Sequence, residues 1–348
     1  MGQFRRGRAR VRGHESTGGA GEIESCEESS MKLRPEGVTE WRAPRRPGPP
    51  LVSIVLPTYN RAGLLRRSVD SILGQTERDF ELLIVDDGSG DETREYAARM
   101  REQDPRVGYM REQNLGLPRA LNNGFRAARG EFWTWTSDDN RYFPEALERL
   151  SGYLRGHPEA GLVYGDMIQR REQGLVFNPP AYRDTFWRNS LFGAAFLYRA
   201  AAARQAGEYD ASLRMVEDYD FMLRLSYVAE VGHWPYIIYE YGEHEESLTS
   251  TRPMEHLDAI GRMFEKHRRL GLASRRDLGD LAVQVSGTSR RRGQCWNGVQ
   301  FGIKAICLWP FNWRAYRSTL FALVVGARRG WGSARVPGSG RVPDKSSS

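Results

Sequence analysis

The chain has 348 residues, 40% of them hydrophobic and 27% charged, which is enough for one large or two modest domains with a sizeable core. This composition excludes a wholly disordered chain, and no run of 18 apolar residues exists to embed the chain in a membrane. Residues 1–50 hold ten basic and seven acidic side chains, and residues 286–348 hold eleven basic and one acidic. The segment between them therefore has a net charge of −6, although the whole chain has a net charge of +7. An acidic body with basic ends argues against a nucleic-acid-binding domain, which concentrates Arg and Lys on its folded core.

From residue 51 onward, short apolar runs alternate with segments of helical periodicity. The predicted strands are 52–56, 80–85, 107–110, 132–135 and 162–164, and the predicted helices include 91–101, 118–128 and 144–154. A further predicted helix lies between the first two strands, where Leu65, Val69 and Ile72 share one face and Asn60 is placed to cap the N-terminus. This alternation predicts an α/β fold, with a mostly parallel sheet and helices on both faces.

The cysteines and the N-terminus give expectations about the compartment. Cys26, Cys295 and Cys307 are scattered and odd in number, so they indicate neither a disulfide framework nor a zinc site. The first residues are rich in Arg and Gly and lack the apolar segment of a secretory signal. We therefore expect a reducing, cytoplasmic location.

Two predicted strands end in adjacent aspartates, Asp86 with Asp87 and Asp138 with Asp139. Ligands of such sheets bind outside the carboxyl ends of the strands. For the first pair a plain turn is an equally good interpretation. The second pair follows an apolar stretch, and a divalent cation such as Mg²⁺ or Mn²⁺ would offset the repulsion between its carboxylates. No glycine-rich phosphate loop is present, which favours a metal that bridges the diphosphate of a nucleotide-bearing substrate.

Several motifs, taken together and in order, resemble glycosyltransferase family 2. They are VSIVLPTYN at 52–60, SILGQT at 71–76, DFELLIVDDGS at 79–89, SDDN at 137–140 and EDYD at 217–220. The resemblance covers about residues 50–245. It implies a GT-A fold and a nucleotide-diphosphate sugar as substrate.

The resemblance also implies roles for residues on the donor side. Pro57 and Tyr59 would line the nucleobase pocket, with the Tyr59 ring against the base. Asp87 would hydrogen-bond the base, usually uracil, and Arg119 would lie near the nucleotide. Asp138 would contact the ribose or the sugar.

Further roles concern the metal and the transfer step. Asp139 would ligate Mg²⁺ or Mn²⁺, although the adjacent aspartates depart from the commoner Asp-x-Asp spelling. His244 lies where some relatives place a histidine near the diphosphate and metal, and a surface role is equally open. Asp218 resembles the general base, and Glu217 beside it is grouped with the substrate-binding residues. A favourable charge at a helix N-terminus is a compatible explanation of both.

The function implied is a metal-dependent inverting glycosyltransferase. It would move a sugar, usually UDP-linked, to a hydroxyl of a saccharide or lipid-linked acceptor, in polysaccharide or glycolipid synthesis at the inner face of the cell membrane. Inversion needs a base for the acceptor hydroxyl and an electrophile for the leaving diphosphate, roles open to Asp218 and to a cation at Asp139. The alternatives are a catalytically inactive relative that binds a sugar nucleotide or a partner, and a nucleic-acid-binding protein with Arg-rich ends.

The predicted organisation has four parts. Residues 1–50 form a disordered basic tail and linker, and 51–250 the catalytic domain, with a nucleotide-binding half (51–140) and an acceptor half (141–250). Residues 251–329 are helical, and 330–348 form a disordered tail. Two helical segments, around 299–308 and 316–325, mix apolar residues with flanking Arg and Lys, so they either pack on the catalytic domain or rest on anionic lipid.

Overall fold

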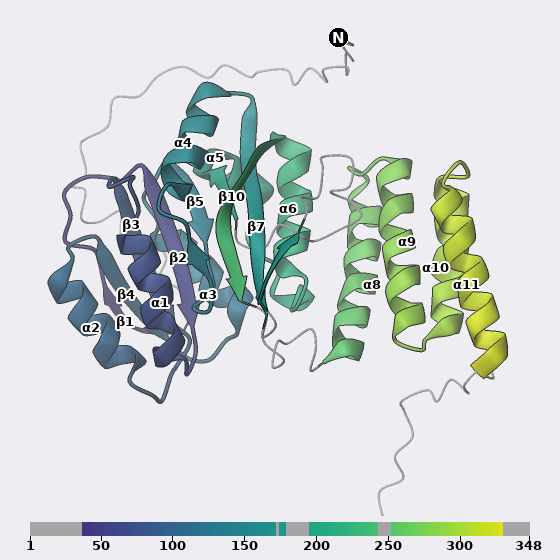
Figure 1. Cartoon of the computed structure of the whole chain (residues 1–348), viewed down its shortest axis with the longest axis horizontal. Coiled ribbons are helices and arrows are strands. Elements are labelled where there is room, and N and C mark those ends of the chain that lie inside the picture. The colour runs from purple at the N-terminus through teal and green to yellow at the C-terminus, as the bar shows by residue number, and fades with distance from the viewer. Residues whose placement is uncertain (1–36, 172–173, 179–194, 243–251, 330–348) are drawn as a thin grey trace, which may run out of the picture. The chain divides into compact units, whose positions relative to one another are not determined.

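The computed structural model describes residues 37–171, 174–178, 195–242 and 252–329. Within these ranges the chain forms a ten-stranded sheet covered by helices, followed by the helices α8 to α11 (Figure 1). The strand order is β1-β4-β3-β2-β5-β9-β7-β10-β6, and β8 pairs with β7. The predicted α/β fold is confirmed.

The first half of the sheet is parallel and contains the predicted strands. These strands are β2 (Val52–Thr58), β3 (Phe80–Asp86), β4 (Val107–Glu112) and β5 (Phe132–Trp135). They alternate with the helices α1 (Ala62–Leu73), α2 (Thr93–Gln103) and α3 (Leu117–Ala127). Every residue of β2 and β3 is buried, as expected for parallel strands with helices on both faces.

The second half of the sheet is mixed. β7 (Ala160–Arg171) and β10 (Glu230–Gly242) are parallel, whereas β6 (Arg141–Tyr142), β8 (Gly174–Asn178) and β9 (Phe196–Arg199) run antiparallel to their neighbours. The helical elements here are α4 (Ala146–Gly156), α5 (Ala200–Ala206), the 3₁₀ turn η3 (Ala211–Leu213) and α6 (Glu217–Val228). The strand predicted at 162–164 thus lies in the first half of a much longer one.

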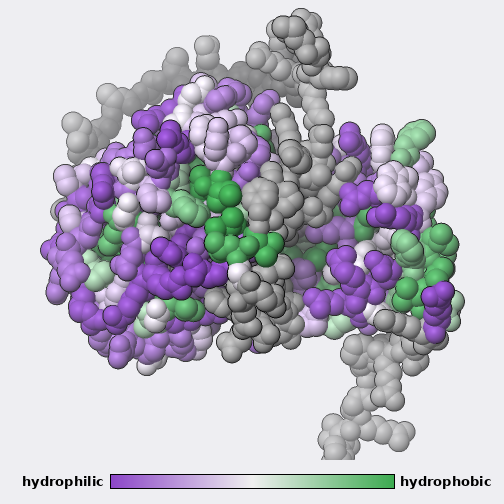
Figure 2. All heavy atoms as spheres, in the orientation of Figure 1, coloured by the Kyte–Doolittle hydropathy of each residue, from purple (hydrophilic) through white to green (hydrophobic). Residues whose placement is uncertain are grey.

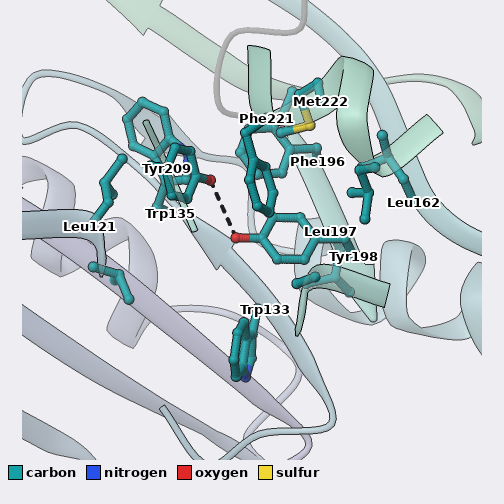
Figure 3. Packing of buried hydrophobic residues seen from close by; sticks show 14 of the residues in the cluster. Leu121, Trp133, Trp135, Leu162, Phe196, Leu197, Tyr198, Tyr209, Phe221 and Met222 are labelled. Atoms are coloured by element: carbon teal, nitrogen blue, oxygen red, sulfur yellow. Dashed lines mark hydrogen bonds between the residues drawn. The ribbon is translucent and has the colours of Figure 1, made fainter. Parts of the chain in front are cut away.

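Aromatic side chains pack where β5 and β9 meet α6 (Figure 3). The ring of Tyr209 stacks on Phe221 with centroids 4.3 Å apart, and Phe196 stacks on Tyr198 at 5.8 Å. The hydroxyls of Tyr198 and Tyr209 lie 3.4 Å apart. Because Tyr209 precedes α6 and Phe221 lies within it, this cluster holds the beginning of α6 against the sheet.

Part of the predicted N-terminal tail belongs to the sheet. β1 (Val38–Arg42) pairs antiparallel with β4 and covers an edge that would otherwise expose unpaired backbone groups. The N–H of Arg45 donates to the carbonyl of Pro105 at 2.8 Å, and the Arg46 guanidinium donates to Asp79 at 2.6 Å. The expectation of a tail and linker is therefore wrong for residues 38–46, while residues 1–36 and 330–348 lie outside the described ranges.

The cap of α1 also differs from the prediction. The N–H of Ala62 donates to a carboxylate oxygen of Asp91 at 3.0 Å, 29 positions further along the chain. Asn60 adopts a left-handed conformation with φ of 54°, and its side-chain oxygen accepts from the N–H of Gly90 at 2.7 Å. Asn60 therefore joins two loops instead of capping the helix.

The helical region begins with α8 (Pro253–Leu270) and continues with α9 (Arg275–Arg291), α10 (Cys295–Leu308) and α11 (Trp313–Arg329). Among the described residues no helix is both long and apolar enough to cross a membrane.

A buried cluster of charges ties α8 to α6. The fully buried carboxylate of Asp220 lies 3.1 Å from Nε2 of His267, 2.9 Å from Nζ of Lys266 and 2.9 Å from Nε of Arg224. Burial by itself raises the pKa of Asp220, but the His267 hydrogen bond and the Arg224 and Lys266 charges outweigh it, so the pKa lies below the usual value.

The close packing of α3 on the sheet gives a first prediction. A Cβ atom at Gly124 would lie 2.5 Å from Cγ1 of Val55 and 3.1 Å from Cγ2 of Val85, whereas one at Gly152 of α4 would meet nothing within 4 Å. We expect Gly124→Ala to lower the free energy of unfolding by about 1–3 kcal/mol through overpacking. Gly152→Ala should raise it by up to about 1 kcal/mol through helix propensity. Urea denaturation of both variants measures this, and equal effects would contradict the packing described.

The buried charge cluster gives a second prediction. Asp220→Asn should lower the free energy of unfolding at neutral pH by about 3 kcal/mol, because the partly buried cations Arg224 and Lys266 lose their partner. Because the pKa of Asp220 is lower in the folded protein than in the unfolded chain, the ionised carboxylate stabilises the fold when the pH lies above the pKa of an unfolded aspartate. This stabilisation disappears as the pH falls through the pKa of Asp220 in the folded protein. The gap between wild type and variant should therefore narrow toward about pH 3 in urea titrations. Asp258→Asn, at an exposed position of α8, is the control, and a gap that does not change with pH would contradict the assignment.

Candidate active site

The loops after β2, β3 and β5 meet at the carboxyl ends of the parallel strands. The N–H of Asp87 donates to the carbonyl of Thr58 at 2.9 Å. The Thr58 hydroxyl donates to Oδ2 of Asp138 at 2.8 Å. Thr58 thus brings the two predicted substrate-binding aspartates to one place, at the edge where such sheets bind ligands.

Arg61 lies between the adjacent carboxylates. Its Nη1 is 3.3 Å from Oδ1 of Asp138 and 3.2 Å from Oδ2 of Asp139. The repulsion that suggested a metal is therefore offset in part by a guanidinium. No sequence motif indicated Arg61 apart from its position directly after the segment 52–60.

Asp138 is a buried carboxylate in a setting of mixed charge. Burial raises its pKa to about 6, with Asp139 acting in the same direction. The hydrogen bond from Thr58 and the charge of Arg61 act against this rise. A cation bound nearby would further favour the ionised carboxylate.

Asp86 and Asp87 differ although they are neighbours. Asp86 is fully buried and accepts hydrogen bonds from the Tyr109 hydroxyl at 2.7 Å and from Arg111 at 3.0 Å. These contacts give Asp86 a structural role at the end of β3.

Asp87 instead reaches the loop between β4 and α3. Its Oδ1 accepts from the N–H of Leu115 at 2.7 Å and its Oδ2 from the N–H of Gly116 at 3.0 Å. Burial raises the pKa of Asp87, and these two hydrogen bonds oppose the rise. Each carboxylate oxygen has a second lone pair, so Asp87 can still accept from a ligand.

The other predicted donor-side residues occupy different settings. Tyr59 is 46% exposed, so its ring is accessible to a ligand, whereas Pro57 is buried at the end of β2. Arg119 is exposed in the first turn of α3. His244 lies outside the described residues.

Glu217 and Asp218 lie in the first turn of α6, which begins two positions after a strained residue. Met215 has φ of 79°, a conformation that side chains with a Cβ rarely adopt, and such strain concentrates at functional sites. Glu217 is buried, and its Oε2 has no hydrogen-bond partner among the described residues. Asp218 is partly exposed and accepts from the N–H of Tyr219 at 2.7 Å. Burial raises the pKa of both carboxyl groups.

Arg214 links the beginning of α6 to the loops at the sheet edge. Its positive charge lowers the pKa of both Asp87 and Glu217, against the larger effect of burial. A Cβ atom at Gly116 would lie 3.7 Å from the guanidinium carbon of Arg214. Arg214 therefore lies between the donor-side loops and the turn that carries Asp218, a position that no sequence motif indicated.

Few side chains at the site could ligate a metal. Among the residues that the structure describes, no three His, Cys, Asp or Glu side chains come together as a metal site. Asp139 offers carboxylate oxygens, the ligand type that Mg²⁺ and Mn²⁺ prefer. Mg²⁺ commonly uses one or two carboxylates and takes its other ligands from substrate phosphates and water. The residues present fit a cation that Asp139 would hold and whose coordination substrate phosphates and water would complete.

Comparison with known proteins finds related glycosyltransferases. A family profile described as glycosyl transferase family 2 matches residues 53–206. A PGL/p-HBAD biosynthesis glycosyltransferase from Mycobacterium tuberculosis is 36% identical over 186 residues, which cover 50% of this chain and 69% of that protein.

Solved structures share the fold at low sequence identity. Staphylococcus aureus TarS 1–349 in complex with UDP-GlcNAc superposes with a TM-score of 0.63 at 16% identity, covering 80% of this chain and 92% of that one. The mannosyltransferase PcManGT from Pyrobaculum calidifontis, in complex with GDP-Man and Mn²⁺, gives 0.53 at 17% identity, covering 88% and 93%. The fold is thus of the GT-A type, and with the matching profile and relative it follows that the chain belongs to glycosyltransferase family 2.

Proposed function

We propose that this chain is a metal-dependent inverting glycosyltransferase that transfers a sugar from a UDP-linked donor to a hydroxyl acceptor. The acceptor is a saccharide or a lipid-linked molecule of polysaccharide or glycolipid synthesis. The observation that carries the proposal is the meeting of Asp87, Asp138 and Asp139 around Thr58 and Arg61 at the sheet edge. The UDP-GlcNAc in TarS and the PGL/p-HBAD biosynthesis role in the name of the mycobacterial relative support the donor and acceptor classes.

On the donor side, the exposed ring of Tyr59 stacks on the nucleobase, beside Pro57. Asp87 accepts a hydrogen bond from the base, and its two backbone contacts hold it in position for this. Arg119 supplies positive charge near the nucleotide. Asp138, oriented by Thr58, accepts from a hydroxyl of the ribose or sugar.

Asp139 is the proposed ligand of Mg²⁺ or Mn²⁺. His244 is a second ligand predicted from the sequence alone. When bound, the cation would stabilise the negative charge that develops on the leaving diphosphate. The Mn²⁺ in the complex of the mannosyltransferase neighbour supports the use of a divalent cation. Arg61 adds a positive charge beside the same carboxylates, where it balances them before the donor binds.

Asp218 is the proposed general base. It takes the proton of the acceptor hydroxyl while the acceptor oxygen bonds to the anomeric carbon. The bond from this carbon to the diphosphate oxygen breaks on the opposite side, and its electron pair leaves with the diphosphate, so the configuration inverts. A pKa raised by burial makes Asp218 a stronger base than an ordinary aspartate.

Asp218→Asn tests this role. We expect the rate of transfer to fall by about 10²- to 10⁴-fold, because the variant keeps the size of the side chain and loses the base. Thermal stabilisation by UDP should be retained, since donor contacts lie elsewhere. Glu95→Gln, at an exposed acidic position in the first turn of α2, is the matched control and should transfer normally.

The pH profile sharpens that test. The base must be ionised, so kcat/KM should fall as the pH drops through the Asp218 pKa, at a midpoint above the usual aspartate value of about 3.9. Transfer by Asp218→Asn at the wild-type rate would remove the proposed base. Failure of the wild type to transfer any sugar, with UDP still bound, would favour a catalytically inactive sugar-nucleotide-binding relative.

The metal is tested by its effect on donor binding. Mn²⁺ together with UDP should stabilise the wild type more than UDP alone, approaching about 2.7 kcal/mol when the ligand is a hundredfold above its dissociation constant. Asp139→Asn should abolish the part that depends on Mn²⁺, and Asp258→Asn should keep it. Identical stabilisation by UDP in Mn²⁺ and in chelator would contradict the metal role of Asp139.

A further inference from the structure

The helix α11 exposes its large apolar side chains on its outer face. The exposed ones are Trp313, Tyr316, Leu320, Phe321, Leu323 and Val324. Apart from Phe321, they recur at spacings of three, four, three and one residues, which places them on one face of the helix. Figure 2 shows hydrophobic residues exposed on this part of the surface.

The inward face of α11 consists of small residues. Ala315 and Ala322 are fully buried, and Thr319 contacts Gly302 of α10 so closely that no Cβ would fit there. Packing of α11 on its neighbours therefore leaves the bulky apolar side chains outside. Such a contiguous exposed patch marks an interaction surface.

The charged side chains of α10, α11 and the turn between them are all basic. Residues 295–329 contain five Lys and Arg and no Asp or Glu. Arg317 lies over the ring of Trp313 with its guanidinium carbon 4.7 Å from the centroid, and Arg290 of α9 lies 5.7 Å from that of Phe321. The exposed aromatic rings of α11 therefore lie next to guanidinium groups, which border the apolar face.

We propose that the face of α11 docks on the surface of an anionic membrane. Apolar and aromatic side chains on one side of a helix, bordered by Arg and Lys, suit a helix that lies in the lipid–water interface. Phe311, 84% exposed in the turn before α11, extends the apolar contact. A second copy of this chain is disfavoured as the occupant, because a symmetric contact would bring two wholly basic surfaces together.

This inference does not depend on the transfer chemistry, and a test with lipid alone separates the two. The full chain is sedimented with vesicles of phosphatidylcholine, with or without phosphatidylglycerol. We expect binding to the vesicles that contain phosphatidylglycerol, weakened by added salt, and little binding to phosphatidylcholine alone.

Two variants probe the apolar and the basic contributions. The double variant Leu320→Gln, Leu323→Gln should weaken vesicle binding about tenfold or more, because both side chains are exposed in solution and buried in lipid. Arg317→Glu should also weaken it about tenfold or more, and only for the anionic vesicles. Leu175→Gln, at a residue 60% exposed on β8, is the matched control and should bind as wild type.

All these positions are exposed, so circular dichroism and UDP stabilisation should stay at wild-type values. Absence of binding to anionic vesicles would overturn the proposal. The same holds for binding that the α11 variants leave unchanged. A dimer in solution that dissociates in the double variant, with no lipid binding, would assign the face to a second copy and also overturn it.

Discussion

The structure depends on pairing the carboxylates that are buried at one edge of the sheet. A buried carboxylate without a partner costs several kcal/mol, so each must receive hydrogen bonds or a positive charge from a neighbouring segment. Asp86 takes them from β4, Asp87 from the loop before α3, and Asp138 from Thr58 and Arg61. Satisfying these groups forces the loops after the parallel strands into one arrangement, which is also the wall of the site.

The helix α6 joins the chemistry of the site to the rest of the chain. Asp218 lies in its first turn, close to the strained Met215, and Asp220, two positions later, is buried against Lys266 and His267 of α8. One short helix therefore carries the proposed base and the anchor of the helical region.

The helical region ends in a surface that contrasts with the acidic body of the chain. α11 turns small residues inward and bulky apolar ones outward, with basic side chains beside them. Membrane docking through this face and a lipid-linked acceptor would suit one another, because both place the reaction near lipid. Each rests on its own observations, so either can fail alone.

The sequence by itself determined the parallel half of the sheet, since periodicity and strand-end aspartates are local patterns, and the family motifs identified the carboxylates. It did not indicate that β1 pairs with β4, that Asp91 caps α1, or that Arg61 and Arg214 serve the predicted aspartates. These partners lie tens of residues apart along the chain, and nothing in local propensity encodes them. Only the tertiary structure brings them together, because the burial of charge depends on which loops the fold places side by side.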